Sequence, residues 1–102
     1  MFVFEDILLV NDKGIQAVLK EIENEELALS LKTASEELRE KIFKNMSERA
    51  SQFIKEDMEF MGPVRVSDVE GAQQKIVDVV RRLEDAGEVI ISGRGGEKEM
   101  IV

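Results

Sequence analysis

The chain has 102 residues, 43% of them hydrophobic, and its 22 acidic and 14 basic residues give a formal net charge of −8. This length predicts one domain with a modest core, and the acidic balance argues against a nucleic-acid partner, whose phosphates require a basic face. Cysteine and histidine are absent, so disulfides and thiolate sites are excluded and the commonest general base and metal ligand are missing. No apolar run approaches a membrane span, so we expect no direct membrane insertion, and no signal-peptide pattern opens the chain.

The first expected element is the apolar segment Met-Phe-Val-Phe at residues 1–4. Periodicity alone favours a terminal segment packed on the core, with a junction to something upstream as the alternative. A first helix follows, capped by Asn11 or Asp12, with one apolar face formed by Ile15, Val18, Leu19 and Ile22. A short helical segment from about residue 25 to 33 then carries Leu27, Ala28 and Leu31.

Two capped helices come next. Ser35 is expected to cap a helix over about residues 36–45, on whose surface Glu37 pairs with Lys41 and Glu40 with Lys44. Ser47 is expected to cap a fourth helix, whose predicted buried stripe is Ala50, Phe53, Ile54, Met58 and Met61. Gly62 ends this helix and Pro63 prevents its continuation.

The last predicted helix begins at a capping box, Ser-Asp-Val-Glu at residues 67–70, after an extended connector. It is expected to bury Val69, Ala72, Ile76, Val80 and Leu83, to pair Asp78 with Arg81 and Arg82, and to end at Gly87. Residues 88–92 are either a short strand or extended chain, and residues 92–102 are expected to be a flexible tail. The pattern predicts a single-domain, compact all-α multi-helix bundle.

Three charges on the fourth helix lack a partner on that helix. Arg49, Glu56 and Asp57 have no opposite charge three or four residues away. The helix dipole does not favour them either, because the base is early and the acids are late. One interpretation is a solvated face or pairing with a neighbouring helix. With Arg65 in the following connector, a binding surface recognised by charge is the alternative that we favour.

Enzyme chemistry has almost no support in the sequence. Gly93, Arg94, Gly95 and Gly96 are not followed by a helix start, so they make a poor phosphate loop. Most serines and threonines fall at helix starts, where capping explains them. Glu56, Asp57 and Glu59 lack the spacing of a calcium loop. We therefore expect no catalytic activity, no cofactor and no metal.

Three segments carry a resemblance to a known family. LREKIFKNMSERA, GPVRVSDVEGAQQKIVDVVRRLEDAGEVII and MFVFEDI look like the C-terminal domain of FliG, the bacterial flagellar motor switch protein, and the similarity covers nearly all of residues 1–91. It implies armadillo-like, superhelical helix packing. It also implies torque-generating charges at Lys32, Arg49, Glu56, Asp57 and Arg65, of which Lys32 rests on the resemblance alone.

The same resemblance implies a place and partners. The domain would lie in the rotor at the cytoplasmic face of the inner membrane, facing the cytoplasmic loop of the stator protein MotA and taking part in direction switching. A secondary contact to FliM and contacts to neighbouring FliG subunits in a ring are also implied. Met1, Phe2, Val3 and Phe4 would form a hinge, and Gly62–Pro63 a second break. Short helices would occupy residues 5–33, and a charge-bearing subdomain residues 35–91.

A second function remains open. The domain could be a structural helical module that only assembles rotor subunits through FliM or neighbouring FliG, with its charges acting as a solubilising surface.

Overall fold

The structure, a computed structural model, describes residues 2–91. In chain order its elements are η1 (Phe4–Leu9), α1 (Asp12–Leu19), α2 (Asn24–Ser30), η2 (Leu31–Thr33), α3 (Glu36–Lys44), α4 (Glu48–Met61) and α5 (Val66–Asp85). The predicted all-α class is confirmed. The predicted tail at residues 92–102 and Met1 lie outside the described residues.

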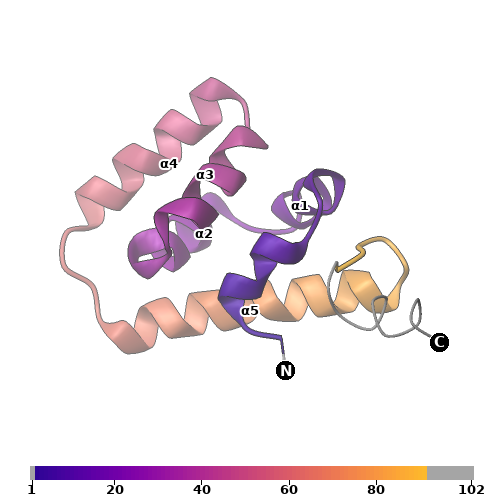
Figure 1. The fold of residues 1–102 in the computed structure, drawn as a ribbon. Helices are drawn as coiled ribbons and strands as arrows, with labels where there is room; N and C mark the ends of the chain where they lie inside the picture. The colour runs from indigo at the N-terminus through magenta and orange to yellow at the C-terminus, as the bar shows by residue number, and fades with distance from the viewer. Residues whose placement is uncertain (1, 92–102) are drawn as a thin grey trace.

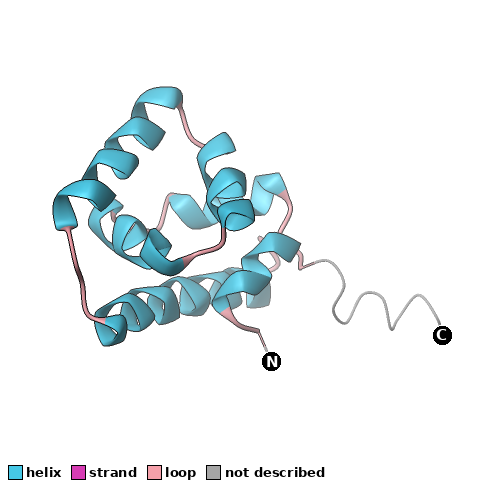
Figure 2. Cartoon of the chain, turned by 60° about the vertical axis from the view of Figure 1, so that its left-hand side comes forward, coloured by secondary structure: helices cyan, strands magenta, loops and turns pink. Residues whose placement is uncertain are grey.

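The helices are arranged around α2. Helix α5 lies along one side of the molecule, with η1, α1 and α2 against it, while α4 lies on the other side of α2 (Figure 1). Helices α4 and α5 leave the connector at 62–65 in diverging directions, as both views show (Figure 2). Because α2 contacts both α4 and α5, it holds the two long helices apart.

One hydrophobic core joins residues from every helix. Its fully buried side chains include Ile7, Ile15, Leu31, Leu38 and Val80. All five apolar positions predicted for the last helix are buried. Helix α4 contributes much less, because Ile54 is its only buried hydrophobic side chain in the described chain, with Met58 and Met61 partly buried. Most of the surface of α4 is therefore left to solvent.

Local signals set most helix ends as predicted. The side chains of Asn11, Ser35 and Ser47 accept hydrogen bonds from the first turns of α1, α3 and α4. Gly62 follows α4 with a φ of 61°. Gly87, with a φ of 79°, closes α5: its N–H donates to Glu84 O, and the Glu88 N–H donates to Leu83 O at 2.8 Å. This pair of bonds is a Schellman motif.

The start of α5 corrects the sequence prediction. The helix begins at Val66 with Arg65 as its N-cap, rather than at the predicted Ser67 box. The Arg65 carbonyl accepts from the N–H groups of Asp68 and Val69, both at 3.1 Å. Val66, which was expected to be extended, therefore already belongs to the helix, and Ser67 lies inside its first turn.

The segment after α5 is extended chain with a single bridge. Ile91 pairs antiparallel with Val10, and both are buried, as is Val89. These contacts fix the end of the described chain against the loop between η1 and α1.

Candidate interaction surface

The outward face of α4 combines charges with aromatic rings. Arg49 and Glu56 are exposed on it, and so are Phe53 and Phe60, whose exposed fractions are 53% and 87%. The prediction that Phe53 is buried is therefore wrong. The buried line of α4 runs through Ser51 and Ile54, and at about 100° per residue Phe53 lies too far around the helix to join it.

Arg49 and Glu56 belong to one shallow hollow. They are seven residues apart, so they share an azimuth about 10 Å apart along the helix axis. Together with Phe53 and Gln52 they line the same concave surface. The Gln52 amide donates to the Glu56 carboxylate at 3.3 Å. Neither charge has an ion-pair partner among residues 2–91.

Three ion pairs elsewhere in the described part of the chain join separate elements, and two of them involve α5. The Lys75 ammonium lies 2.7 Å from the Glu26 carboxylate, and the Arg82 guanidinium lies 2.6 Å from that of Glu21. The hydrogen bond and the charge of Glu26 raise the pKa of Lys75. Arg82 was expected to pair with Asp78, which instead accepts from Gln74 at 2.9 Å. That expectation is wrong because α5 packs beside the α1–α2 connection, which brings Glu21 within reach.

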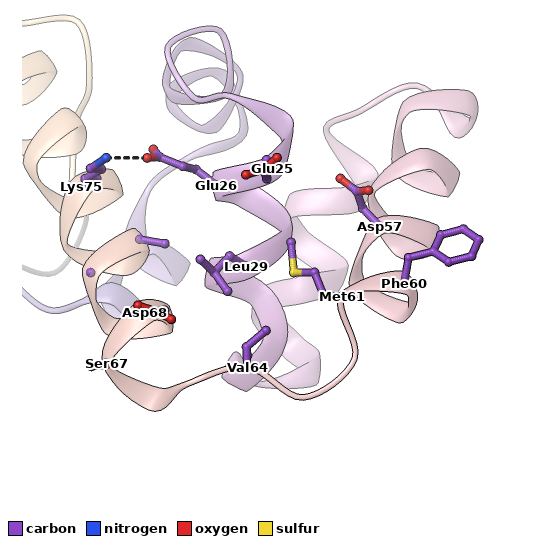
Figure 3. Close-up of a pocket in the computed structure, with 12 residues that line it drawn as sticks. Glu25, Glu26, Leu29, Asp57, Phe60, Met61, Val64, Ser67, Asp68 and Lys75 are labelled. Carbon is purple, nitrogen blue, oxygen red and sulfur yellow. Dashed lines mark hydrogen bonds and ion pairs between the residues drawn. The ribbon is translucent and has the colours of Figure 1, made fainter.

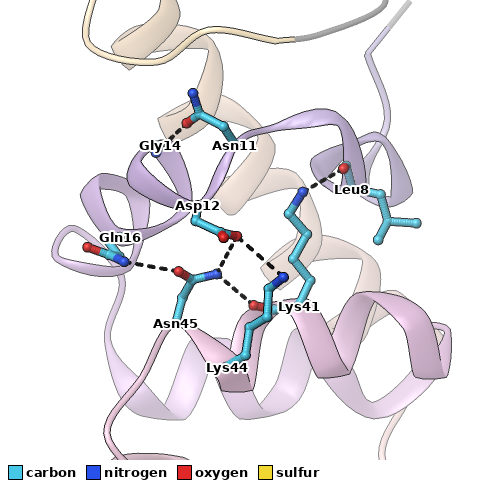
Figure 4. Close-up of polar contacts among 8 residues, drawn as sticks. All are labelled: Leu8, Asn11, Asp12, Gly14, Gln16, Lys41, Lys44 and Asn45. Carbon is cyan, nitrogen blue, oxygen red and sulfur yellow. Dashed lines mark hydrogen bonds and ion pairs between the residues drawn. The ribbon is translucent and has the colours of Figure 1, made fainter.

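The predicted surface pairs of α3 are replaced in the same way (Figure 4). Lys41 donates to the Leu8 carbonyl at 2.7 Å, and Lys44 lies 3.8 Å from Asp12. Asn45 donates to Asp12 at 3.1 Å and accepts from Gln16 at 3.0 Å. The hydrogen bond from Asn45, assisted by the charges of Lys44 and Lys41, lowers the pKa of Asp12. This polar cluster fastens α1 to α3.

Asp57 and Arg65 lie apart from the Arg49–Glu56 hollow. Asp57 is half-buried and lines a groove toward α2 and α5, since it lies about 100° around the helix from Glu56. Arg65 is exposed at the N-terminus of α5, beyond the connector. Asp57 therefore lies on a different side of α4 from Arg49 and Glu56, and Arg65 lies beyond the connector.

Lys32 has a backbone partner. Its half-buried ammonium donates to the Met58 carbonyl of α4 at 3.0 Å. Arg39 in turn donates to the carbonyls of Leu31 and Lys32, both at 2.9 Å. The last carbonyls of a helix lack intrahelical donors and carry the negative end of its dipole. Lys32 thus caps α4, while Arg39 fixes the segment that carries Lys32.

The residues predicted to form hinges are placed differently from one another. Phe2 and Phe4 are buried in the core, while Val3 is half exposed. Just after them, the Glu5 carboxylate accepts from both the backbone N–H and the hydroxyl of Ser35, at 3.0 and 2.7 Å. Pro63 is exposed in the connector after Gly62. The first segment is thus held against α3, whereas the second lies at the surface.

The exposed aromatic rings are the main feature that the sequence reasoning missed. Phe53 and Phe60 are seven residues apart and share a face of α4 with Arg49 and Glu56. That seven-residue spacing is visible in the sequence and could have indicated a second apolar stripe on the exposed face of the helix. Assigning Phe53 to the core concealed it.

The described residues form an all-α domain whose helix α4 is largely exposed. Within residues 2–91 no group of three or more carboxylate, histidine or cysteine side chains could hold a metal ion. The described helices also include none long and apolar enough to cross a membrane. The concave surfaces around α4 are shallow and lined by charged and apolar side chains.

Comparison with known proteins identifies the family. Residues 1–91 match the FliG C-terminal domain family, and the chain belongs to it. The flagellar motor switch protein FliG of Thermotoga maritima is 60% identical over 102 residues, which cover this whole chain and 30% of that protein. The Bacillus subtilis FliG is 56% identical over the same length, again 30% of the relative. The chain therefore spans less than a third of the curated relatives that it matches.

Solved structures agree with this assignment. A crystal structure of Helicobacter pylori FliG, residues 116–343, superimposes with a TM-score of 0.85 at 38% identity, covering 87% of this chain and 39% of that one. Full-length Aquifex aeolicus FliG gives a TM-score of 0.83 at 40% identity, covering 85% and 27%. The predicted armadillo-like packing is consistent with this membership.

Proposed function

We propose that this chain is part of the rotor of a bacterial flagellar motor, at the cytoplasmic face of the inner membrane. Its charges at Lys32, Arg49, Glu56, Asp57 and Arg65 interact with the cytoplasmic loop of the stator protein MotA to generate torque. The observation that carries the proposal is the outward face of α4. There Arg49 and Glu56 are exposed and have no ion-pair partner among residues 2–91.

Contact through several weak ion pairs suits a rotor that must bind and release the stator repeatedly. An exposed ion pair contributes only about 0–1 kcal/mol, so no single pair would hold the stator in place. Opposite charges also guide the encounter of two surfaces and fix their register. Single neutralisations at Arg49 or Glu56 are therefore expected to reduce torque partially, and combined neutralisations are expected to reduce it more than additively.

Charge reversal with compensation tests this contact directly. Arg49→Glu should impair motility more than Arg49→Gln, because like charges then face each other. A lysine or arginine introduced in place of an acidic residue of the MotA loop should partly restore torque, measured per motor at matched expression. Failure of every stator reversal to rescue Arg49→Glu would refute the charge contact. Unfolding of the reversed domain would show that Arg49 is structural.

The same experiment separates the alternative function. A module that only assembles the rotor, through FliM or neighbouring FliG subunits, would tolerate Arg49→Glu without a torque defect as long as the ring assembles. We retain the stator contact as the primary proposal because Arg49 and Glu56 line one hollow with the exposed Phe53 and have no ion-pair partner within residues 2–91.

Participation in direction switching is part of the proposal, through reorientation at Met1–Phe4 and Gly62–Pro63. The helix-ending φ of Gly62 and the exposed Pro63 support a break at the second position. The chain contains no cysteine, so spin labels on Val3→Cys and Glu70→Cys, both exposed positions, report one distance. The distance between the two labels is compared in motors locked in each rotation direction. If the two distances are identical, no reorientation occurs between these positions.

A further inference from the structure

A groove opens between α2, the end of α4 and the first half of α5 (Figure 3). Its volume is about 680 Å³. It exists because α4 and α5 diverge from the connector while α2 lies between them. Apolar atoms of Leu29, Met61, Val64 and Ala72 line its floor. The groove therefore offers a partner an apolar surface at the side of α4 to which Asp57 belongs.

The rim of the groove is acidic. Four carboxylates line it, from Glu25, Glu26, Asp57 and Asp68, against the single ammonium of Lys75. That ammonium is already bound to Glu26. The other three carboxylates have no ion-pair partner within residues 2–91. An apolar floor surrounded by free carboxylates is complementary to an apolar side chain that has basic neighbours.

We propose that this groove seats one apolar side chain of a basic stator segment, whose flanking lysine or arginine residues lie over Glu25, Asp57 and Asp68. The inference rests on the proposed function, because Asp57 belongs both to the groove and to the stator-facing charges. Removing the floor from water supplies affinity that the charges alone lack. The rim fixes the register of the segment and disfavours acidic segments. The outward face of α4 and this groove are then two parts of one contact.

Gly71 provides a way to fill the groove without disturbing the fold. It lines the groove on α5, and a Cβ added there would meet nothing within 4 Å. Gly71→Leu therefore places a bulky side chain in the groove, while Gly71→Ala leaves most of it open. Both replacements favour the helix relative to glycine. The alanine variant is the matched control, and thermal unfolding of the two verifies that both are folded.

The probe is a synthetic peptide of the MotA cytoplasmic loop from the same bacterium, titrated into the 102-residue chain by calorimetry. Gly71→Leu should weaken binding about tenfold or more, as expected when an anchor loses its pocket, while Gly71→Ala should bind like the wild type. Replacing Glu25 and Asp68 together by Gln and Asn should weaken binding several-fold and lessen its salt dependence, because the floor is kept and the rim charge is reduced.

The outcomes separate this inference from the function on which it rests. Equal binding by Gly71→Leu and Gly71→Ala, with Arg49→Glu still weakening the peptide, overturns the groove and leaves the charge contact standing. If neither Gly71→Leu nor Arg49→Glu weakens peptide binding, both the groove and the charge contact are overturned. Weaker binding by Gly71→Leu and by the rim double variant, with Gly71→Ala binding like the wild type, supports the groove as the anchor.

Discussion

Replacing Lys32 by methionine should lower the stability of the domain, although Lys32 is one of the proposed stator-facing charges. Its ammonium donates to the Met58 carbonyl at 3.0 Å, and the carbonyls of the last turn of α4 lack intrahelical donors. The Gly62 N–H donates to the Glu59 carbonyl at 3.2 Å and not to that of Met58. Methionine keeps a long unbranched stem but removes both the donor and the positive charge.

The expected size follows from the geometry. A hydrogen bond to a charged group contributes roughly 1.5–3 kcal/mol. Lys32 is only half-buried, so water can partly replace the lost donor, and we expect a loss of about 1–2 kcal/mol in the free energy of unfolding. For a domain of this size each kcal/mol shifts the midpoint by roughly 4–8 °C, so Tm should fall by about 5–15 °C.

Thermal unfolding followed by far-UV circular dichroism measures this difference. The matched control is Arg49→Met, which removes a positive charge from an exposed residue of α4 itself. It should stay within about 0.5 kcal/mol of the wild type. Arg39→Met, which removes the guanidinium that donates to the Leu31 and Lys32 carbonyls, should be destabilised like Lys32→Met.

Equal midpoints for Lys32→Met, Arg49→Met and the wild type would refute the capping role and leave Lys32 a simple surface charge. The expected result has a consequence for motility data. A torque defect in a Lys32 variant would then combine a lost charge with a less firmly held α4, whereas a defect in an Arg49 variant would reflect the surface alone.

Three further predictions concern packing and pH. Gly14→Ala should lower the free energy of unfolding by about 1–3 kcal/mol, because the new Cβ would lie 2.6 Å from the buried Val10 side chain. Gly71→Ala has open space around the new Cβ and should instead raise the free energy of unfolding by up to about 1 kcal/mol. Urea unfolding measures both changes. Folding lowers the pKa of Asp12, so the wild type should be more stable than Asp12→Asn above pH 3.8, the ordinary pKa of the carboxyl. This difference in the free energy of unfolding should vanish as the pH falls through the folded pKa. A difference that grows in acid would contradict the prediction. Folding raises the pKa of Lys75, so the wild type should be more stable than Lys75→Met below pH 10.5, the ordinary pKa of the ammonium. This difference in stability should disappear as the pH rises through the folded pKa. A difference that survives at still higher pH would not come from the Lys75–Glu26 pair.

The sequence alone determined the local structure, because a helix end depends on few neighbouring residues. The caps at Asn11, Ser35 and Ser47 and the glycines after α4 and α5 act over three to five residues. The buried face of α5 followed from its apolar period for the same reason. At the start of α5 the local pattern was wrong, because it indicated the Ser67 box whereas the helix begins at Val66 with Arg65 as its N-cap.

Tertiary structure decided which surface of α4 is free and what each charge contacts. Phe53 fitted an apolar period, yet α2 covers only a narrow line of α4, through Ile54 and the partly buried Met58. Lys32 meets the Met58 carbonyl across 26 positions of sequence, and Arg82 meets Glu21 across 61. The acidic groove likewise joins residues of α2, α4 and α5. Such contacts depend on how whole helices pack, which spacing along one helix does not encode.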